Sequence, residues 1–236
     1  LAQIDFTATT GTVLKADAWI AADMLRLENG RMALSWSTAL GRTNEVLNVT
    51  TLDSAGLNRS PVVTADTISS SAHHSHVELS GLGNGNFMTA WSVAPDAPSS
   101  LLSGDALART FSTYGAALAN KYSLSTATSS AESLPALTRL GGGSMLAVWS
   151  DSRTTTETAF ATSIMGRLIS DRGAAAGTEF VINTSASRYN FGAEAETLGD
   201  GRAIVVWASG KQGTTGMVTE GLKGRFVSAH GTPAGP

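Results

Sequence analysis

The chain has 236 residues, a net charge of −3 and no cysteine, and charged residues make up only 15% of it. The lack of cysteine excludes disulfides, thiolate metal sites and a cysteine nucleophile. The sequence has no cluster of basic residues of the kind that binds nucleic-acid phosphates, so nucleic-acid binding is not expected. No apolar run approaches the ~20 residues of a membrane-spanning helix, so we expect no membrane insertion.

The first predicted element is a short strand at residues 1–10, followed by a connection that contains Trp19. A segment ending in tryptophan then occurs four times: LENGRMALSW at 27–36, LGNGNFMTAW at 82–91, LGGGSMLAVW at 140–149 and LGDGRAIVVW at 198–207. The four tryptophans are 55, 58 and 58 residues apart, and each follows a glycine by six residues. Such a period indicates a repeat architecture.

Each repeat predicts four short strands. The first strand ends at the leucine, a glycine hairpin follows, and the second strand runs to the tryptophan. A third strand ends at a second turn glycine and leads to a fourth strand, such as EFVINT at 179–184. Because MLAVW and AIVVW are apolar on consecutive residues, these strands are expected to be buried on both faces, as in a propeller blade and unlike a sandwich.

We therefore predict an all-β fold, a four-bladed β-propeller of four-stranded antiparallel blades. It forms a single domain over 1–236, with blades at about 20–68, 74–126, 132–185 and 190–236. The last repeat ends in GTPAGP, just after its third strand. The strand at 1–10 is expected to supply the missing fourth strand and to close the ring.

At these residues the chain resembles the propeller-type, tryptophan-containing repeats of large secreted bacterial proteins, which are associated with adhesins and RTX proteins. The resemblance rests on LGDGRAIVVW, on MGRLISDRG at 165–173 and on GTEFVINT at 177–184. The blade number is similar to that of hemopexin-like propellers, a likeness of architecture alone. The resemblance implies an extracellular or cell-surface protein from a bacterium.

One position in the connection before each blade varies in chemistry while its surroundings repeat, which is typical of a ligand-binding surface. Its occupants are Trp19, His74, Glu132 and Asn190. The alternative for Trp19 is a plug that covers the core. His74 also belongs to an HHSH cluster with His73 and His76; in an extended strand His74 and His76 would point to the same side, as two metal ligands can.

A second position, four residues before each repeat leucine, is acidic in three blades. Its occupants are Asp23, Glu78, Ala136 and Glu194. On the innermost strand these acids would converge on the central channel, where a calcium or magnesium ion would relieve their repulsion. In the alternative, they point between blades and pair with the repeat arginines, Arg109, Arg167 and Arg225, which are expected to be structural.

No catalytic motif stands out in the sequence, so no catalytic residue is predicted. The leading hypothesis is a non-enzymatic extracellular module for binding or adhesion, with a carbohydrate or a protein surface as its partner. The alternative is an enzyme that cleaves polysaccharide with paired carboxylates, drawn from Glu132, Asp151, Glu194 and Glu196. A third hypothesis is a structural spacer in a larger exported protein. The oligomeric state is left open by the sequence.

Overall fold

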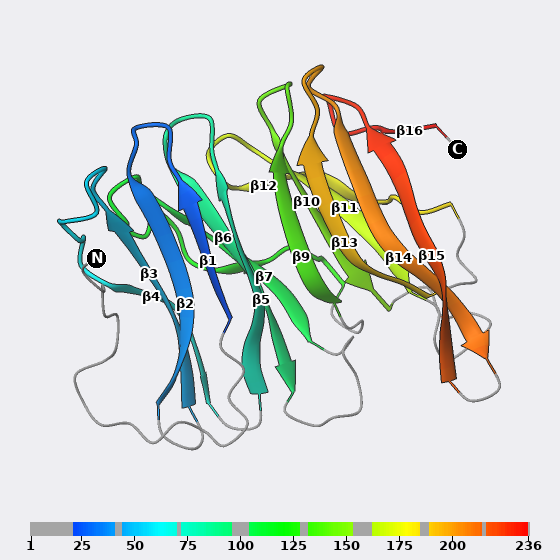
Figure 1. Ribbon diagram of the computed structural model, residues 1–236, viewed down its shortest axis with the longest axis horizontal. Helices are drawn as coiled ribbons and strands as arrows, with labels where there is room; N and C mark the ends of the chain where they lie inside the picture. The colour runs from blue at the N-terminus through cyan, green and yellow to red at the C-terminus, as the bar shows by residue number, and fades with distance from the viewer. Residues whose placement is uncertain are drawn as a thin grey trace.

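The computed structural model describes residues 21–40, 44–69, 72–95, 104–127, 132–152, 162–184, 189–213 and 216–235. Over these ranges the chain forms sixteen strands in four antiparallel sheets of four strands each, without a helix. Accordingly, no helix in the described part is long and apolar enough to cross a membrane. The predicted all-β, propeller-like fold is confirmed (Figure 1).

Each sheet is a simple meander in chain order. The first sheet contains β1 (Ala22–Arg26), β2 (Met32–Leu40), β3 (Asn44–Leu52) and β4 (Val63–Ser69). The second contains β5 (Ala72–Gly81), β6 (Phe87–Pro95), β7 (Asp105–Phe111) and β8 (Tyr122–Ser123). The third contains β9 (Glu132–Arg139), β10 (Met145–Asp151), β11 (Ser163–Ile169) and β12 (Ala175–Val181), and the fourth β13 (Tyr189–Thr197), β14 (Ala203–Gly213), β15 (Gly216–Val227) and β16 (Pro233–Ala234).

The predicted glycine turns join the first two strands of every sheet. In the third sheet the Gly143 N–H donates to the Leu140 carbonyl at 3.0 Å, and Gly143 has a φ of 90°. Gly201 does the same with Leu198 at 2.8 Å and a φ of 83°. A side chain would strain this left-handed conformation, so the repeated glycine fixes the hairpin and thereby the register of the two strands.

The apolar core consists of three clusters, one between each pair of successive sheets. Trp91 and Trp149 are 0% exposed and Trp207 is 4% exposed, and each faces the sheet that precedes its own in the chain. Trp36, in the first sheet, is only half-buried. In the second and third sheets, which have a neighbour on each side, the second strand is therefore covered on both faces, as the sequence predicted.

The first strands β1, β5, β9 and β13 form the inner row of the molecule. Each packs against the next one in chain order, and Figure 1 shows the first and fourth sheets at opposite ends of this row. In the described part of the chain β1 and β13 do not pack along each other. The strand predicted at 1–10, with the closure assigned to it, lies outside the described residues.

The end of the fourth sheet differs from the prediction. Its fourth strand is present as β16, where Pro233 pairs with Val227 and Ala234 with Phe226. These two residues correspond to the start of β12, where Ala175 pairs with Ile169. Strand β16 was not predicted because the proline and glycine residues in GTPAGP are poor strand formers, yet this segment directly follows the turn at Gly231.

The repeat arginines stabilise the contacts between sheets, as predicted, but with other partners than expected. Arg109 donates to the carbonyls of Thr64 and Ala65 at 2.9 and 3.0 Å, and thus reaches the fourth strand of the preceding sheet. Arg167 reaches the Leu124 carbonyl at 3.1 Å and Arg225 the Ile182 carbonyl at 2.8 Å. The predicted pairing with the inner-strand acids is wrong, because these guanidinium groups bind backbone carbonyls far from the inner row.

Candidate active site

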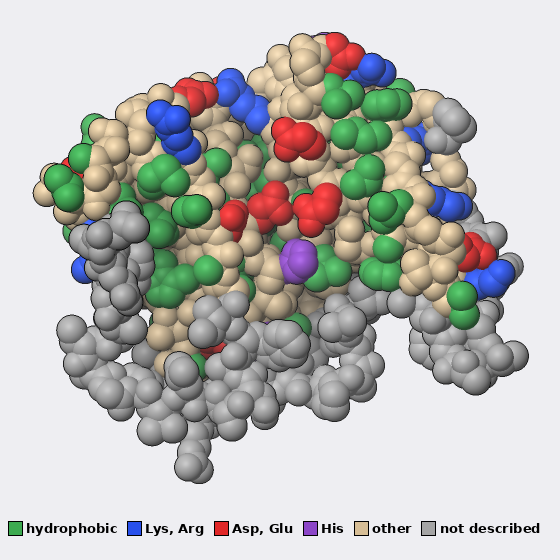
Figure 2. All heavy atoms as spheres, viewed as in Figure 1, with side chains coloured by type: hydrophobic (Ala, Val, Ile, Leu, Met, Phe, Trp, Pro, Cys, Tyr) green, Lys and Arg blue, Asp and Glu red, His purple; other side chains and the backbone are tan. Residues whose placement is uncertain are grey.

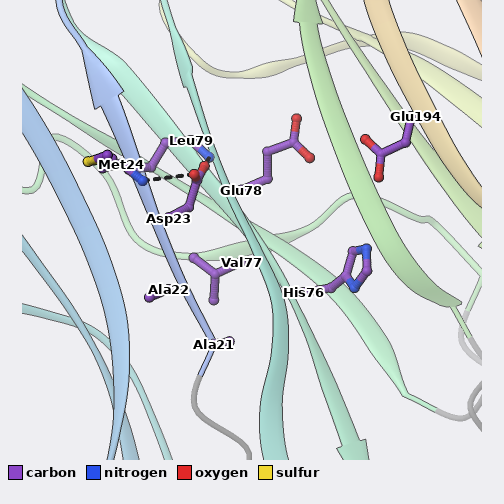
Figure 3. Close-up of a pocket in the computed structure, with 9 residues that line it drawn as sticks. All are labelled: Ala21, Ala22, Asp23, Met24, His76, Val77, Glu78, Leu79 and Glu194. Carbon is purple, nitrogen blue, oxygen red and sulfur yellow. Dashed lines mark hydrogen bonds between the residues drawn. The ribbon is translucent and has the colours of Figure 1, made fainter.

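A pocket of about 580 Å³ opens on the inner row, between β1, β5 and β13. Its lining includes three of the residues singled out by sequence, Asp23, Glu78 and Glu194, together with His76. Figure 3 shows the side chains of Glu78, Glu194 and His76 directed toward the same space. In Figure 2 the acidic side chains form a row across the middle of the exposed face, with the histidine beside them.

Two of the acids connect neighbouring inner strands. Asp23 Oδ2 on β1 accepts the backbone N–H of Leu79 on β5 at 2.7 Å. Glu78 Oε1 on β5 accepts the backbone N–H of Leu137 on β9 at 2.9 Å. The same repeat position thus makes the same bond to the next sheet, which fixes the carboxyl groups in the pocket wall.

A bulge in each later inner strand sets the direction of the pocket side chains. The register of β5 shifts between Ser75 and Glu78, and that of β13 shifts between Phe191 and Glu194. His76 lies in the first of these bulges with a φ of 52°, where β13 has Gly192 with a φ of 61°. Leu134 has a φ of 57° at the same position of β9, so the left-handed residue is a repeated feature of these inner strands.

The bulge also corrects the predicted geometry of the histidine cluster. An extended strand would place His74 and His76 on one side, as predicted, but the extra residue of the bulge inverts the alternation between them. His74 is 0% exposed and packs toward the first sheet, whereas His76 is exposed and lines the pocket. A bulge of this kind has no reliable sequence signal unless a glycine occupies it, as in β13.

Glu78 has the most perturbed carboxyl group of the pocket. Burial raises the pKa of Glu78, the negative charges of Glu194, Asp23 and Glu196 act in the same direction, and the Leu137 N–H opposes them, so that the pKa is about 7. Burial lowers the pKa of His76, although the charge of Glu194 opposes this. Near neutral pH, Glu78 is therefore a half-buried acid that still holds a proton beside an exposed glutamate.

The predicted cation site lies at this pocket, since Asp23, Glu78 and Glu194 all line it. However, both oxygens of Asp23 accept backbone N–H groups, from Leu79 and from Met24. No group of three or more His, Asp and Glu side chains within the described ranges has the arrangement of a metal site. Calcium or magnesium binding stays a prediction, which thermal unfolding with either cation or with a chelator would test.

The other predicted binding position lies elsewhere, at the far end of each inner strand. His74, Glu132 and Asn190 are buried there, with 0%, 1% and 1% exposed. Asn190 accepts the Trp207 Nε1–H at 2.9 Å and donates to the Thr162 carbonyl, also at 2.9 Å. These side chains therefore have partners within the fold, and Trp19 lies outside the described residues.

His74 belongs to a buried polar cluster between the first two sheets. Its Nδ1 lies 3.0 Å from Glu45 Oε1, and its Nε2 lies 3.5 Å from Asp66 Oδ2. Asp66 also accepts the Trp91 Nε1–H at 3.1 Å and forms an ion pair with Lys121. Burial opposes the charge of His74, but the hydrogen bonds to Asp66 and Glu45 outweigh it and raise the pKa of His74 above its usual value.

Of the four carboxylates proposed from sequence for an enzyme, only Glu194 lines the pocket. Glu196 is exposed two residues further along β13. Glu132 and Asp151 lie opposite each other on β9 and β10 and are both buried. From sequence, Glu78 was predicted to bind a metal and not to act in catalysis, because the burial that raises its pKa is not visible in sequence.

Comparisons with known proteins support the fold but assign no family. No protein-family model and no curated protein match the sequence. A protein of unknown function from Dyadobacter fermentans has a similar structure, with a TM-score of 0.58, 14% identity and coverage of 86% of this chain and 51% of that one. The chain thus spans about half the length of the Dyadobacter protein.

Two further similar structures are enzymes that act on carbohydrates. The α-L-arabinanase of Penicillium chrysogenum, solved with arabinobiose, has a TM-score of 0.55 and 12% identity and covers 90% of this chain and 74% of its own. The intramolecular trans-sialidase of Ruminococcus gnavus has a TM-score of 0.54 and 14% identity, with coverage of 90% and 44%. At such identities the likeness establishes the shared fold.

These comparisons overturn the leading hypothesis from sequence. The expected non-enzymatic binding or adhesion module has no counterpart among these structures, and no family model supports the resemblance to secreted tryptophan repeats. The similar structures of stated activity are glycoside-processing enzymes. At 11–16% identity these structures share the fold with this chain, and the likeness assigns it no activity.

Proposed function

We propose that the protein hydrolyses a glycosidic bond of a poly- or oligosaccharide in the pocket of the inner row, with Glu78 as the general acid. One observation carries the proposal: a half-buried carboxyl group with a pKa raised to about 7 shares a pocket with the exposed carboxylate of Glu194. Two carboxyl groups in different environments are what glycoside hydrolysis requires. The carbohydrate-active enzymes with a similar fold support the same conclusion.

The hydrogen bond of Glu78 determines which of its oxygens can act. Oε1 accepts the Leu137 N–H, so in the proposed mechanism Oε2 carries the proton and donates it to the glycosidic oxygen as the C–O bond breaks. The leaving sugar departs as an alcohol, and Glu78 is left as a carboxylate. The charges around Glu78 that raise its pKa then favour its reprotonation.

Glu194 is proposed as the general base. It lies on β13, separated from Glu78 on β5 by β9 in the inner row; in the proposed mechanism a water molecule lies between its carboxylate and the sugar. Glu194 takes a proton from this water, whose oxygen bonds to the anomeric carbon. Asp23, fixed by Leu79 and Met24, is a positioning residue, and exposed His76 is placed to bind sugar hydroxyls at the pocket mouth.

The test is hydrolysis of a panel of arabinose-, xylose- and hexose-based oligosaccharides, followed by release of reducing ends. We expect at least one to be cleaved, and we expect Glu78→Gln and Glu194→Gln each to lower kcat/KM by about 10²–10⁴-fold. Glu28→Gln is the matched control, because Glu28 is an exposed acid on the β1–β2 turn that pairs with Arg139 outside the pocket. Equal activity of Glu78→Gln and the wild type would contradict the proposal.

A melting curve for each variant separates loss of chemistry from loss of fold. Glu78→Gln is expected to melt no lower than the wild type above pH 7, because the amide removes a half-buried group that must ionise there. If no member of the panel is cleaved by a protein that melts cooperatively, the assignment as a glycosidase is wrong. The extracellular location stays a prediction from sequence, which fractionation of the source cells would check.

A further inference from the structure

The outward face of the fourth sheet is largely apolar, and no other sheet covers it in the described part of the structure, although the guanidinium group of Arg202 lies 4.7 Å from the centre of the Phe226 ring. Ile204 pairs with Phe226 across β14 and β15, and Val206 pairs with Gly224 on the same face. Val206 is 39% exposed, Leu222 81% and Phe226 39%. Contiguous exposed apolar side chains of this kind mark an interaction surface.

The third sheet shows what this kind of face binds. Its corresponding residues are Leu146, paired with Leu168, and Val148, paired with Gly166. Leu146, Val148 and Ile164 are 0% exposed because the fourth sheet covers them with Val205 and Trp207. The outward face of the fourth sheet thus has the same kind of residues, in the same register, as the face of the third sheet against which the fourth sheet packs with its tryptophan.

At the other end of the row, the first sheet carries a tryptophan-bearing face that no other sheet covers within the described residues. Met24 is 68% exposed there, whereas Leu79 and Leu137, at the corresponding positions of the next two sheets, are 6% and 4% exposed. Trp36 is half-buried, unlike Trp91 and its later counterparts. Met24, Leu34 and Trp36 line a pocket of about 380 Å³ on this face.

We propose that two copies of the chain associate head to tail, with the first sheet of one copy on the fourth sheet of the other. Trp36, Leu34 and Met24 of one copy would meet Val206, Leu222 and Phe226 of its partner. Each of the three interfaces between successive sheets of the chain joins faces of these same two kinds, so the proposed contact would add a fourth interface of the same type. Figure 2 shows apolar side chains over both end sheets, on either side of the acidic row.

The acids of the inner row join the sheets within the chain. Asp23 and Glu78 each accept the backbone N–H that follows the acid position of the next inner strand, at Leu79 and Leu137. Glu194 on β13 is the last acid of this series. The N–H at the corresponding position of the first sheet, that of Met24, already donates to Asp23 Oδ1 at 2.7 Å, so the proposed contact rests on its apolar side chains.

The contact is expected to be weaker than those within the chain. The second, third and fourth sheets each hold the preceding sheet with an arginine, but the first sheet has Thr50 at that position, and its hydroxyl donates to Ser60 within the same sheet. The missing guanidinium removes hydrogen bonds to the partner's last strand. We therefore infer a reversible association that depends on protein concentration. This inference does not rest on the proposed function.

Sedimentation equilibrium over a range of concentrations tests the contact. The wild type is expected to assemble as concentration rises, and Leu222→Arg and Met24→Arg are each expected to remain monomeric. Both side chains are mostly exposed within the chain, so both variants should keep the wild-type melting temperature at low concentration. Leu57→Arg is the matched control, because Leu57 is 82% exposed in the turn between β3 and β4, outside either face.

Mixing the two monomeric variants identifies the faces that meet. Leu222→Arg retains an intact first-sheet face and Met24→Arg an intact fourth-sheet face, so a head-to-tail contact gives a heterodimer that cannot grow further. The proposal is overturned if the wild type stays monomeric at every concentration, or if its assembly persists in either single variant. It is equally overturned if the mixture gives no heterodimer, as a symmetric contact between two fourth sheets would require.

Discussion

Replacing Trp149 by alanine is expected to lower the free energy of unfolding by about 3–5 kcal/mol. The indole is 0% exposed and packs in the cluster between the second and third sheets, with Met88 and Ala90 from the second. The loss combines the transfer of a large aromatic surface to water with a cavity that two rigid sheets cannot close. Urea denaturation of the wild type and the variant measures the difference, and Trp207→Ala should behave similarly.

Trp36→Ala is the control for this prediction. Trp36 occupies the same repeat position but is only half-buried, so its loss should cost about 1–2 kcal/mol. Both substitutions are best measured in the Leu222→Arg background, where self-association adds nothing to stability. A cost for Trp36 equal to that for Trp149 would mean that another sheet covers the first one in solution.

Replacing Asp66 by alanine is expected to lower the free energy of unfolding by about 3–5 kcal/mol, because the substitution breaks a buried charge network. Asp66 is 5% exposed and contacts His74, Lys121 and Trp91 Nε1. Without it, the indole N–H and one side of the imidazole lose their partner between the first two sheets. Thermal and urea unfolding measure the loss, and Asp200→Ala, which removes an exposed pair with Arg202, should cost less than about 1 kcal/mol.

The network also makes stability depend on pH, with a sign that follows from its two shifts. Asp66 and Glu45 raise the pKa of His74 in spite of burial. The contribution of His74 to stability is therefore complete below pH 6.5, and it is lost as the pH rises through the raised pKa of the folded state. Burial alone would raise the pKa of Asp66, but His74 and Lys121 lower it to about 2. Its contribution to stability is therefore lost as pH falls from 3.8 toward 2. In Asp66→Ala this acid effect should be absent, whereas the effect of His74 should be reduced but not abolished, because Glu45 still contacts the imidazole.

The sequence predicted the four sheets because their signals are local. A glycine with positive φ, such as Gly143, must end one strand and start the next, and a strand such as MLAVW must be covered on both faces. The recurrence of both signals gave the number of strands in each sheet. The short strand β16 was missed because its proline has low strand propensity and only the pairing with Val227 orders it.

The candidate site was predicted only in part, because its chemistry depends on contacts between sheets. The alignment of repeats brought Asp23, Glu78 and Glu194 to one pocket. It did not show that the acids bind backbone N–H groups and not arginines, since backbone donors have no sequence signal. The sequence named His76 only as a possible metal ligand beside His74, because the bulge that separates the two residues appears only in the register of β5.

The pH dependence of hydrolysis is the measurement that tests the role of Glu78 most directly. For the substrate cleaved in the panel, kcat/KM should fall as pH rises through about 7, where Glu78 loses its proton. Glu196→Gln removes a charge that raises this pKa and should move the fall to lower pH while hydrolysis continues. A kcat/KM that stays constant or rises from pH 6 to 8, or a fall that Glu196→Gln leaves in place, would contradict the assignment of Glu78 as the acid.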